Sequence, residues 1–449
     1  MQCFTALPGQ ALPPVSEAEQ RSEQAHHLNA GKAHFEQVMQ LIWRSHPRIR
    51  SLGQNLQSAN QKALYQDYRY PDPAFGVAYS NIPYKKDLRF QRDRTPMSGI
   101  EFRLSQPIPF PGKLGLDADI SHIQSHIARL QLEQGKNQLI AEWLRTLVDY
   151  HWLQAQFQWT QTMQQKIKLM ADSARNYYAI GRLSLDQVQF ASITSDQYKD
   201  KLVLLEGQLQ SRQSSYRYFD QTDSPQSPLD QLSRDLELQK YLDTIKKAAN
   251  DPRLDLKESS LTFALQQALA RQAEKKTRRA QLNYLPDSEL FASYRKREFV
   301  DNDPVAGEDF ISFGITMKIP LWTALSNHKQ LESKYLVERS QQSMAADVLQ
   351  RESSQFKALQ DTAASLARRR SNYRTDLLNR ARLALESLQT SYLSGKTDLY
   401  DLLKAYDFLY RLQMEYYELE KEYQQNIIAQ ALITNRVIPQ PGVSKLEVE

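Results

Sequence analysis

Alternating apolar and polar residues mark several short segments of the chain. Between Ile311 and Ile319 every second residue is apolar, and the residues between them are Ser, Gly, Thr and Lys. The same alternation occupies 100–104, and weaker versions lie at 75–79 and 289–295. A period of two predicts a strand with one apolar face. We therefore expect four strands, at about 68–81, 99–110, 287–298 and 310–320.

Apolar residues at a spacing of three and four follow each pair of expected strands. Leu378, Leu385, Leu388 and Tyr392 are one example. This spacing is typical of an amphipathic helix or a coiled coil. The two stretches that carry it, 112–224 and 321–438, contain no proline. Because proline interrupts helices, both stretches can hold very long ones, and an arm from about 113 to 179 would measure about 100 Å.

One glycine interrupts each of these long stretches. Gly181 and Gly395 both stand three residues after a tyrosine. Glycine often ends a helix in a left-handed conformation, and Ser184 and Asp398, three residues further on, are typical first residues of a new helix. Each stretch is therefore predicted to form a helical hairpin, with tips at 178–185 and 392–399.

The order strand, loop, strand and long hairpin occurs twice. The matching landmarks are His46-Pro47 with Asp251-Pro252, Pro71 with Pro286, Pro109 with Pro320, and Gly181 with Gly395, at offsets of 205, 215, 211 and 214. Offsets this similar indicate a tandem duplication. The expected organisation is an N-terminal arm 1–34, a first repeat 35–219, a linker 220–250, a second repeat 251–436 and a C-terminal tail 437–449.

The expected strands have the character of membrane strands. Four strands cannot close a barrel, and an open edge in lipid would leave backbone groups unsatisfied, so several chains would have to share one barrel. Three chains would supply twelve strands. The side chains predicted to face lipid are Ile311, Phe313, Ile315 and Met317. Aromatic residues near the strand ends could form interfacial girdles: Tyr68, Tyr70, Tyr84, Phe90, Phe110, Phe299, Phe310 and Trp322.

Composition excludes several other classes of protein. With 41% hydrophobic and 24% charged residues the chain is not intrinsically disordered. A net charge of +5, spread along the chain, does not indicate nucleic-acid binding. Cys3 is the only cysteine, so no disulfide framework is expected, although it could carry a lipid anchor. The sequence contains no apolar run long enough for a transmembrane helix, and we find no signal peptide in it.

These features together resemble the TolC family of outer-membrane efflux channels. The resemblance covers about 30–436 and rests on the duplicated plan, the strand-to-helix corners 104–113 and 319–322, and the two Tyr-x-x-Gly tips. It implies a mixed α and β membrane protein: a homotrimer with a twelve-stranded β-barrel in the outer membrane of a Gram-negative bacterium and a coiled-coil tunnel in the periplasm. The linker and the chain ends would form an equatorial girdle around the tunnel.

The resemblance also implies partners. They are outer-membrane lipid, a periplasmic adaptor (membrane fusion protein) that docks at the helical tips, and an inner-membrane transporter such as an RND pump. The corner 106–113 is most similar to members that serve heavy-metal exporters. The residues that match the docking turns are Gly181, Arg182, Leu183, Ser184, Gly395, Lys396 and Thr397. The same residues could serve only to turn the chain.

The second tip matches the family's periplasmic gate, with Tyr392, Asp398, Asp401 and Lys404 as the expected gate residues. Three-fold symmetry would turn each of these side chains into a ring at the entrance. Lys404 stands where the family has a second acid, and Gln187 is the first-repeat counterpart of Asp401, so the acidic ring is thinner than the family pattern. Asp398 could equally be a helix-start residue, and the same alternative stays open for Asp401, for which a position in the lumen is favoured.

Nothing in the sequence supports catalysis or a cofactor. The chain has no glycine-rich phosphate loop and no helical His-Glu-x-x-His motif. His122 and His126 are four residues apart on one expected helix, but two ligands alone are weak evidence for a metal site, and an ordinary helix surface explains them better. The leading hypothesis is the exit duct of a tripartite efflux or secretion system. A soluble coiled-coil scaffold or adaptor is the alternative, and a metal-binding periplasmic protein, suggested only by scattered histidines, is a third.

Overall fold

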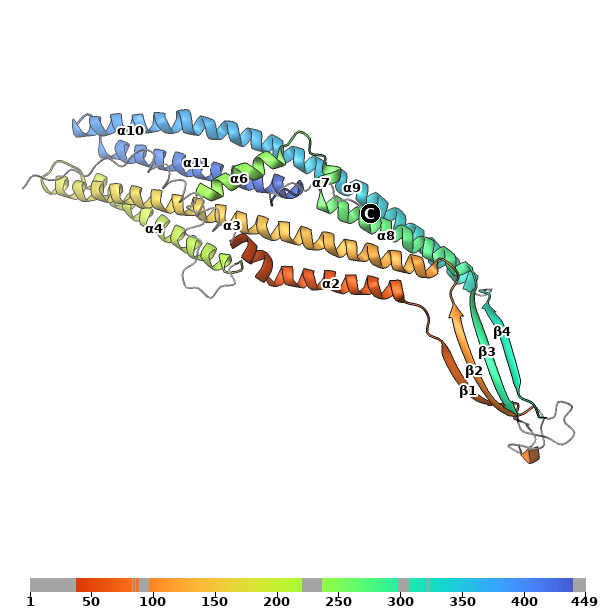
Figure 1. Ribbon diagram of the computed structural model, residues 1–449. Helices are drawn as coiled ribbons and strands as arrows, with labels where there is room; N and C mark the ends of the chain where they lie inside the picture. Colours follow the sequence, from red (N-terminus) through yellow and green to blue (C-terminus); the bar gives the residue numbers. More distant parts are fainter. Residues whose placement is uncertain are drawn as a thin grey trace, which may run out of the picture. The chain divides into compact units, whose positions relative to one another are not determined.

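Figure 1 shows the computed structural model of the chain. It describes residues 38–82, 84, 86–88, 97–219, 236–297, 307–320 and 323–438. The expectations for the arm 1–34, for 220–235, for 439–449 and for Phe90, Phe299 and Trp322 lie outside these residues. The chain forms two compact units, the first made of residues up to 50, 134–260 and 352 onward, and the second of 51–133 and 261–351.

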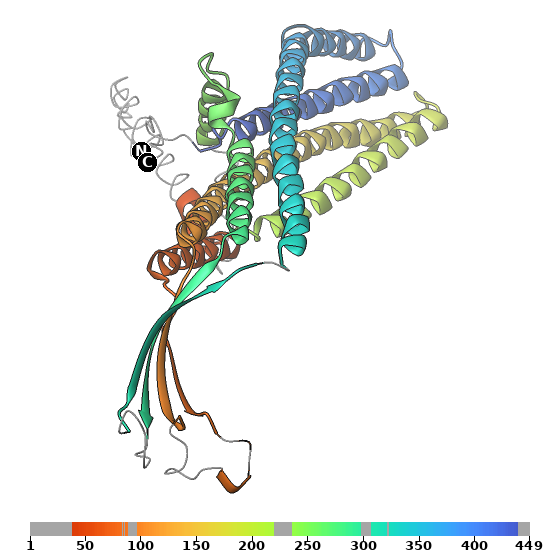
Figure 2. The same cartoon turned by 90° about the vertical axis from the view of Figure 1, so that its right-hand side faces the viewer.

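The second unit contains a four-stranded antiparallel sheet with the order β1-β2-β3-β4. The strands are β1 (Ala74–Ser80), β2 (Gly99–Ile108), β3 (Asp287–Arg297) and β4 (Phe310–Lys318). Figure 2 shows them side by side along their lengths. The central seam between β2 and β3 joins the first repeat to the second, while β1 and β4 are the two edges of the sheet.

Helices of both repeats also pack in the second unit. They are most of α2 (Pro47–Tyr68), α8 (Leu261–Gln281), and the first parts of α3 (Lys113–Ala179) and α9 (Thr323–Asn372). Ile127 and Leu130 of α3 form a small core with Ala268 of α8. Two short 3-10 turns, η1 (Lys86–Leu88) and η2 (Leu282–Tyr284), complete the unit.

The first unit is helical. It holds the rest of α3 and α9, followed by α4 (Leu185–Tyr216), α6 (Leu236–Ala249), α7 (Leu256–Ser259), α10 (Leu378–Leu393) and α11 (Leu399–Ile433). A π-helical segment, η3 (Tyr373–Leu377), separates α9 from α10. Helix α6 lies within the range predicted as a linker, and Gln424 of α11 donates a hydrogen bond to Gln239 of α6 at 2.9 Å.

Packing rather than local propensity stabilises these long helices. Along α3, Leu139, Ile140, Trp143, Leu144 and Leu147 are completely buried. Their spacing of three and four places them on one side of the helix. Each such side chain contributes about 1.5–3 kcal/mol relative to an exposed one. The combination of very long helices with four strands confirms the predicted mixed α and β fold class.

Candidate functional site

One face of the sheet is apolar and uncovered. We call it the apolar face, and in β4 it carries Ile311, Phe313, Ile315 and Met317. All four side chains are more than half exposed, and Phe313 reaches 80%. They share one face because successive side chains of a strand point to opposite sides. Facing of this kind is what the alternating sequence predicts.

Strand register extends the apolar face across the sheet. Opposite Ile311 lies Tyr294, followed by Phe102 and Val77 on the next two strands. The ring of Phe102 stacks on those of Tyr294 and Phe75, with centroids 6.4 and 6.5 Å apart. A continuous uncovered surface of this type marks a contact with a membrane or with another protein.

The opposite face is polar. Arg295 and Glu101 form an ion pair with a nitrogen–oxygen distance of 2.8 Å, and Arg103 lies 3.7 Å from Glu289. The guanidinium of Arg103 also lies 4.2 Å from the centroid of the Phe291 ring. The two faces therefore differ in character, although the exposed Lys296 of β3 shares the apolar face. A sheet between lipid and water has one apolar and one polar face.

Phe291 lies flat against the polar face because its neighbour is a glycine. Gly314 is its cross-strand partner in β4, and a Cβ atom at that position would come within 2.5 Å of the Phe291 ring. Any larger residue at position 314 would displace the ring. An aromatic side chain covering a strand glycine restores packing that the glycine lacks.

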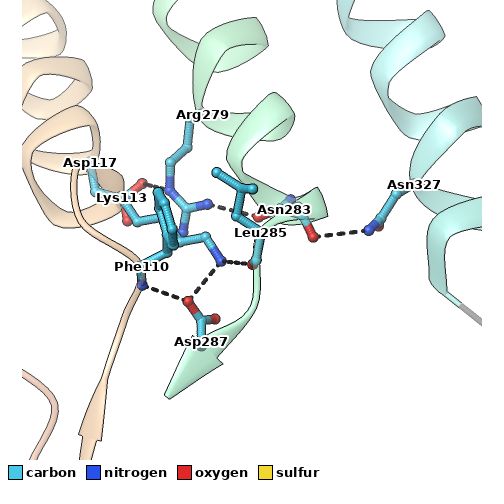
Figure 3. Close-up of polar contacts among 8 residues, drawn as sticks. All are labelled: Phe110, Lys113, Asp117, Arg279, Asn283, Leu285, Asp287 and Asn327. Carbon is cyan, nitrogen blue, oxygen red and sulfur yellow. Dashed lines mark hydrogen bonds and ion pairs between the residues drawn. The ribbon is translucent and has the colours of Figure 1, made fainter. Parts of the chain in front are cut away.

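A buried lysine closes the corner where β2 gives way to α3 (Figure 3). The ammonium of Lys113, whose side chain is only 5% exposed, donates to the Asp287 carboxylate at 2.8 Å and to the Leu285 carbonyl at 3.3 Å. The backbone N–H of Phe110 donates to the same Asp287 oxygen at 2.7 Å. The end of β2 is thus tied to the start of β3.

A second set of contacts fixes α8 at this corner. Arg279 donates to Asp117 of α3 at 2.9 Å and to Asn283 at 2.8 Å, and Asn327 of α9 donates to the Asn283 carbonyl at 3.3 Å (Figure 3). Lys113 was not among the site residues predicted from the sequence. Its position in the sequence could have identified it. A lysine at the first residue of a helix is disfavoured by the helix dipole and needs an acidic partner.

The two hairpin tips have the same backbone turn. Gly181 and Gly395 have φ values of +73° and +72°, in the left-handed region. At each tip the glycine N–H donates to a tyrosine carbonyl three residues back, at 2.9 Å, and the next N–H donates five residues back, also at 2.9 Å. This pair of bonds is a Schellman motif, which ends a helix.

A shared apolar core lies behind the tips in the first unit, and Figure 1 shows both tips at the same end of that unit. It combines Ala174 and Val188 from the first hairpin with Leu385, Leu399 and Leu402 from the second. All five are buried. The core therefore positions the two tips with respect to each other, and the turn residues are left at the surface.

The structure gives the predicted gate residues different surroundings. Asp398 is the N-cap of α11, and its carboxylate accepts the Asp401 N–H at 2.9 Å. Asp401 is exposed. The Lys404 ammonium lies 3.9 Å from the centroid of the Tyr400 ring. Tyr392 packs against the tip core, where burial raises the pKa of its phenol.

Most residues predicted to contact an adaptor are at the surface. Gly181, Arg182, Ser184, Gly395 and Lys396 are exposed, whereas Leu183 and Thr397 are half-buried. Leu183 packs against the tip core. Ser184 precedes α4 without a side-chain capping bond, unlike Asp398. A docking role for these residues stays a prediction.

A polar network, which was not predicted from the sequence, links α4 to α11 behind the tips. The Tyr198 hydroxyl donates to Asp407 at 3.3 Å, and the Lys201 ammonium lies 4.5 Å from the rings of both Tyr198 and Tyr410. Burial, together with the Asp407 charge, raises the pKa of Tyr198 and keeps the phenol neutral. Because 209 residues separate Tyr198 from Asp407, no local pattern could have found the pair.

His122 and His126 of α3 have different surroundings. His122 lies 2.9 Å from Asp67 of α2, and burial lowers the pKa of His126. Within the described residues no group of three His, Cys, Asp or Glu side chains could hold a metal ion. Among the described helices, none has an apolar stretch long enough to cross a membrane.

No protein-family model and no curated protein matches the chain. Solved structures match it along most of its length. CusC, described in terms of transmembrane channel formation, has a TM-score of 0.72 and 13% identity over 88% of this chain and 91% of its own. The outer membrane protein VceC of Vibrio cholerae has a TM-score of 0.71 and 15% identity over 90% and 96% of the two chains.

The CmeC outer membrane channel of Campylobacter jejuni has a TM-score of 0.71 and 10% identity, over 91% of this chain and 86% of its own. The chain has the fold of these outer-membrane channels. The resemblance to the TolC family is thereby confirmed at the level of the fold. A likeness of this kind gives the arrangement of helices and strands, and the assignment of individual residues rests on the geometry described above.

Proposed function

We propose that the chain is one protomer of an outer-membrane channel that forms the exit duct of a tripartite efflux or secretion system. The observation that carries the proposal is the uncovered apolar face of a sheet whose other face is polar and whose two edges are unpaired. A lipid bilayer would cover such a face. Because open edges cannot face lipid, several copies must share one barrel, and three copies would supply twelve strands.

The helical hairpins extend this barrel into the periplasm as a tunnel. Substrates pass through it without chemical change, so the chain is a passive conduit rather than an enzyme. The turn residues 181–184 and 395–397, most of them exposed, would receive a periplasmic adaptor, and an inner-membrane transporter would supply the energy. Asp398, Asp401, Lys404 and Tyr392 would line the periplasmic entrance, with Asp401 the exposed acid that three-fold symmetry turns into a ring.

Two adjacent residues of β4 test the proposal. Ile315 is on the apolar face and 66% exposed, whereas Thr316 is on the polar face. Ile315→Arg should cost about 2–4 kcal/mol near the middle of a bilayer and reduce the amount of channel in outer-membrane fractions, while Thr316→Arg should be tolerated. Channel conductance in planar bilayers should follow the same order. Equal losses, or a wild-type protein that is soluble without detergent and does not conduct, would favour the coiled-coil scaffold instead.

A further inference from the structure

Lys296 of β3 is the exception on the apolar face. The strand register places it opposite Ile100 and on the same side of the sheet as Tyr294. It is the one charged residue that the four described strands place on this face, and it is exposed. The ion pairs between the described strands, Arg103–Glu289 and Arg295–Glu101, lie on the polar face, so Lys296 belongs to neither.

The acid whose charge acts on Lys296 is already bound to other groups. Asp309 precedes β4, and one of its oxygens accepts the backbone N–H of Arg297 at 2.8 Å. The Tyr294 hydroxyl donates to its other oxygen. Among the described contacts of Asp309, Lys296 supplies an attraction between opposite charges and no hydrogen bond. An ammonium has three N–H donors, so Lys296 can bind an anion from outside the chain.

The position of Lys296 along β3 is that of a lipid head group. It lies nine residues after Asp287, which the Lys113 contact fixes at the strand-to-helix corner. Nine residues extend about 30 Å along a strand. For a strand tilted by about 40° this is about 23 Å across the membrane, close to the apolar band of about 25 Å. Lys296 therefore lies at the far boundary of the band, where a lysine is tolerated.

A groove on the apolar face lies on the same strand as Lys296. It has a volume of about 510 Å³ and includes Ala292, Leu104 and Phe313 in its lining. Ala292 is paired with Leu104 on one side and with Phe313 on the other, and its small side chain leaves the space between them. Four residues, or about 13 Å, separate Ala292 from Lys296 along β3. An acyl chain in the groove would thus continue towards a head group at the lysine.

We propose that Lys296 and this groove bind one phosphorylated glycolipid of the outer leaflet. The Lys296 ammonium donates to the phosphate, and an acyl chain of the same molecule fills the groove at Ala292. The outer leaflet of a Gram-negative outer membrane consists of glycolipids whose glucosamine head groups carry phosphates. The inference rests on the proposed function, since the end of the sheet away from the helices faces outward only in a channel of that kind.

Lipid binding by the purified channel tests the two parts of the site. Native mass spectrometry should detect binding of synthetic lipid A, which carries two phosphates, about fivefold tighter than binding of its dephosphorylated form. Lys296→Gln should abolish this preference, because the variant lacks the charge that attracts the phosphate. Ala292→Leu should weaken both lipids alike, since the larger side chain fills the groove. Inorganic phosphate should not displace the lipid, because it lacks the acyl chain.

The matched control is Lys318→Gln, which removes an exposed lysine from the polar face of β4 and should keep the preference. Equal loss of preference in Lys296→Gln and Lys318→Gln would show a general effect of charge and overturn the site. Displacement of lipid A by inorganic phosphate would overturn the lipid as its ligand. A wild-type channel that conducts without preferring the phosphorylated lipid would overturn this inference alone. A wild-type protein that neither conducts nor needs detergent would overturn the proposed function.

Discussion

The two repeats end in tips that share a turn and differ in their side chains. At the first tip, Gly181 is followed by Ser184, which makes no capping bond, and by Gln187. At the second, Gly395 is followed by Asp398, which caps α11, and by the exposed Asp401. The common part is the backbone, held by a left-handed glycine and a shared core. The two repeats have kept the same turn, but only the second tip has an acid, Asp401, at the position that Gln187 occupies in the first.

The strand-to-helix corners of the two repeats also differ in their side chains. In the first repeat Lys113 is buried against Asp287, whereas the second repeat has Ala324 at the equivalent position. The first corner joins β2 to β3 within one chain, and the Lys113–Asp287 ion pair stabilises that junction. Equivalent positions of the two repeats therefore need not make equivalent contributions to stability. Substitutions at matched positions can test this difference.

The largest effect is expected at the corner. Lys113→Met keeps the length of the side chain but removes the donor to Asp287 and Leu285, and should destabilise the fold by about 1–3 kcal/mol. Thermal unfolding in detergent, followed by circular dichroism, measures the loss. Lys275→Met is the matched control, because its pair with Asp119 is more exposed and should be worth at most about 1 kcal/mol. Similar losses for both variants would show that burial of Lys113 adds nothing.

The next largest effect is expected at the tip glycines. Gly181→Ala and Gly395→Ala each place a Cβ in the left-handed region, which costs about 1–2 kcal/mol. The same unfolding measurement should give nearly equal losses of unfolding free energy, since the two φ values differ by only one degree. Gly207→Ala is the control: this glycine lies inside α4 with open space around it, so the variant should be slightly more stable. Unequal losses of unfolding free energy at the two tips would mean that the surrounding residues stabilise the two turns to different degrees.

A smaller effect should separate the two helix starts. Asp398→Ala removes a carboxylate that accepts the Asp401 N–H, and should cost about 1 kcal/mol. Ser184→Ala removes a hydroxyl that makes no capping bond and should cost much less. The difference between their unfolding free energies is the quantity to measure. A larger loss for Ser184→Ala would contradict the assigned capping.

The smallest effect is expected from a substitution in the proposed gate. Asp401→Ala removes one charge per chain from the entrance, and should change cation preference or conductance about twofold and weaken block by divalent cations. Planar-bilayer recordings provide the measurement. Gln187→Ala, at the equivalent position of the first tip, should leave conduction unchanged. Asp407 is unsuitable as a control because it binds Tyr198 and Arg411. Unchanged conduction in Asp401→Ala would remove this residue from the gate.

Sequence patterns anticipated the parts of the fold that depend on local order. Strand faces follow from alternation, as at Ile315 and Thr316, and long arms follow from the absence of proline. The tips follow from glycine placed after an amphipathic run. These signals are readable because each depends on residues within one or two turns of helix or strand.

The features that were not predicted from the sequence depend on contacts between segments that are distant along the chain. The Lys113–Asp287 pair exists because β2 lies beside β3, and Tyr198 reaches Asp407 because α4 packs on α11. Helix α6 lies within the range 220–250 that was predicted as a linker. The gate and adaptor residues depend on copies and partners beyond the single chain, and their roles stay predictions.

The π-helical turn between α9 and α10 has a consequence for how the chain can change length during evolution. Leu366 and Leu378 are both buried, although their spacing of 12 residues would turn an uninterrupted α-helix about 120° out of phase. A π-turn holds one additional residue, which restores the phase. The arm from Pro320 to Gly395 is 75 residues, against 72 from Pro109 to Gly181, so the repeats have already diverged in length. Deleting one residue within 373–377 should therefore be tolerated, whereas a deletion elsewhere in the arm would rotate its apolar stripe away from the core.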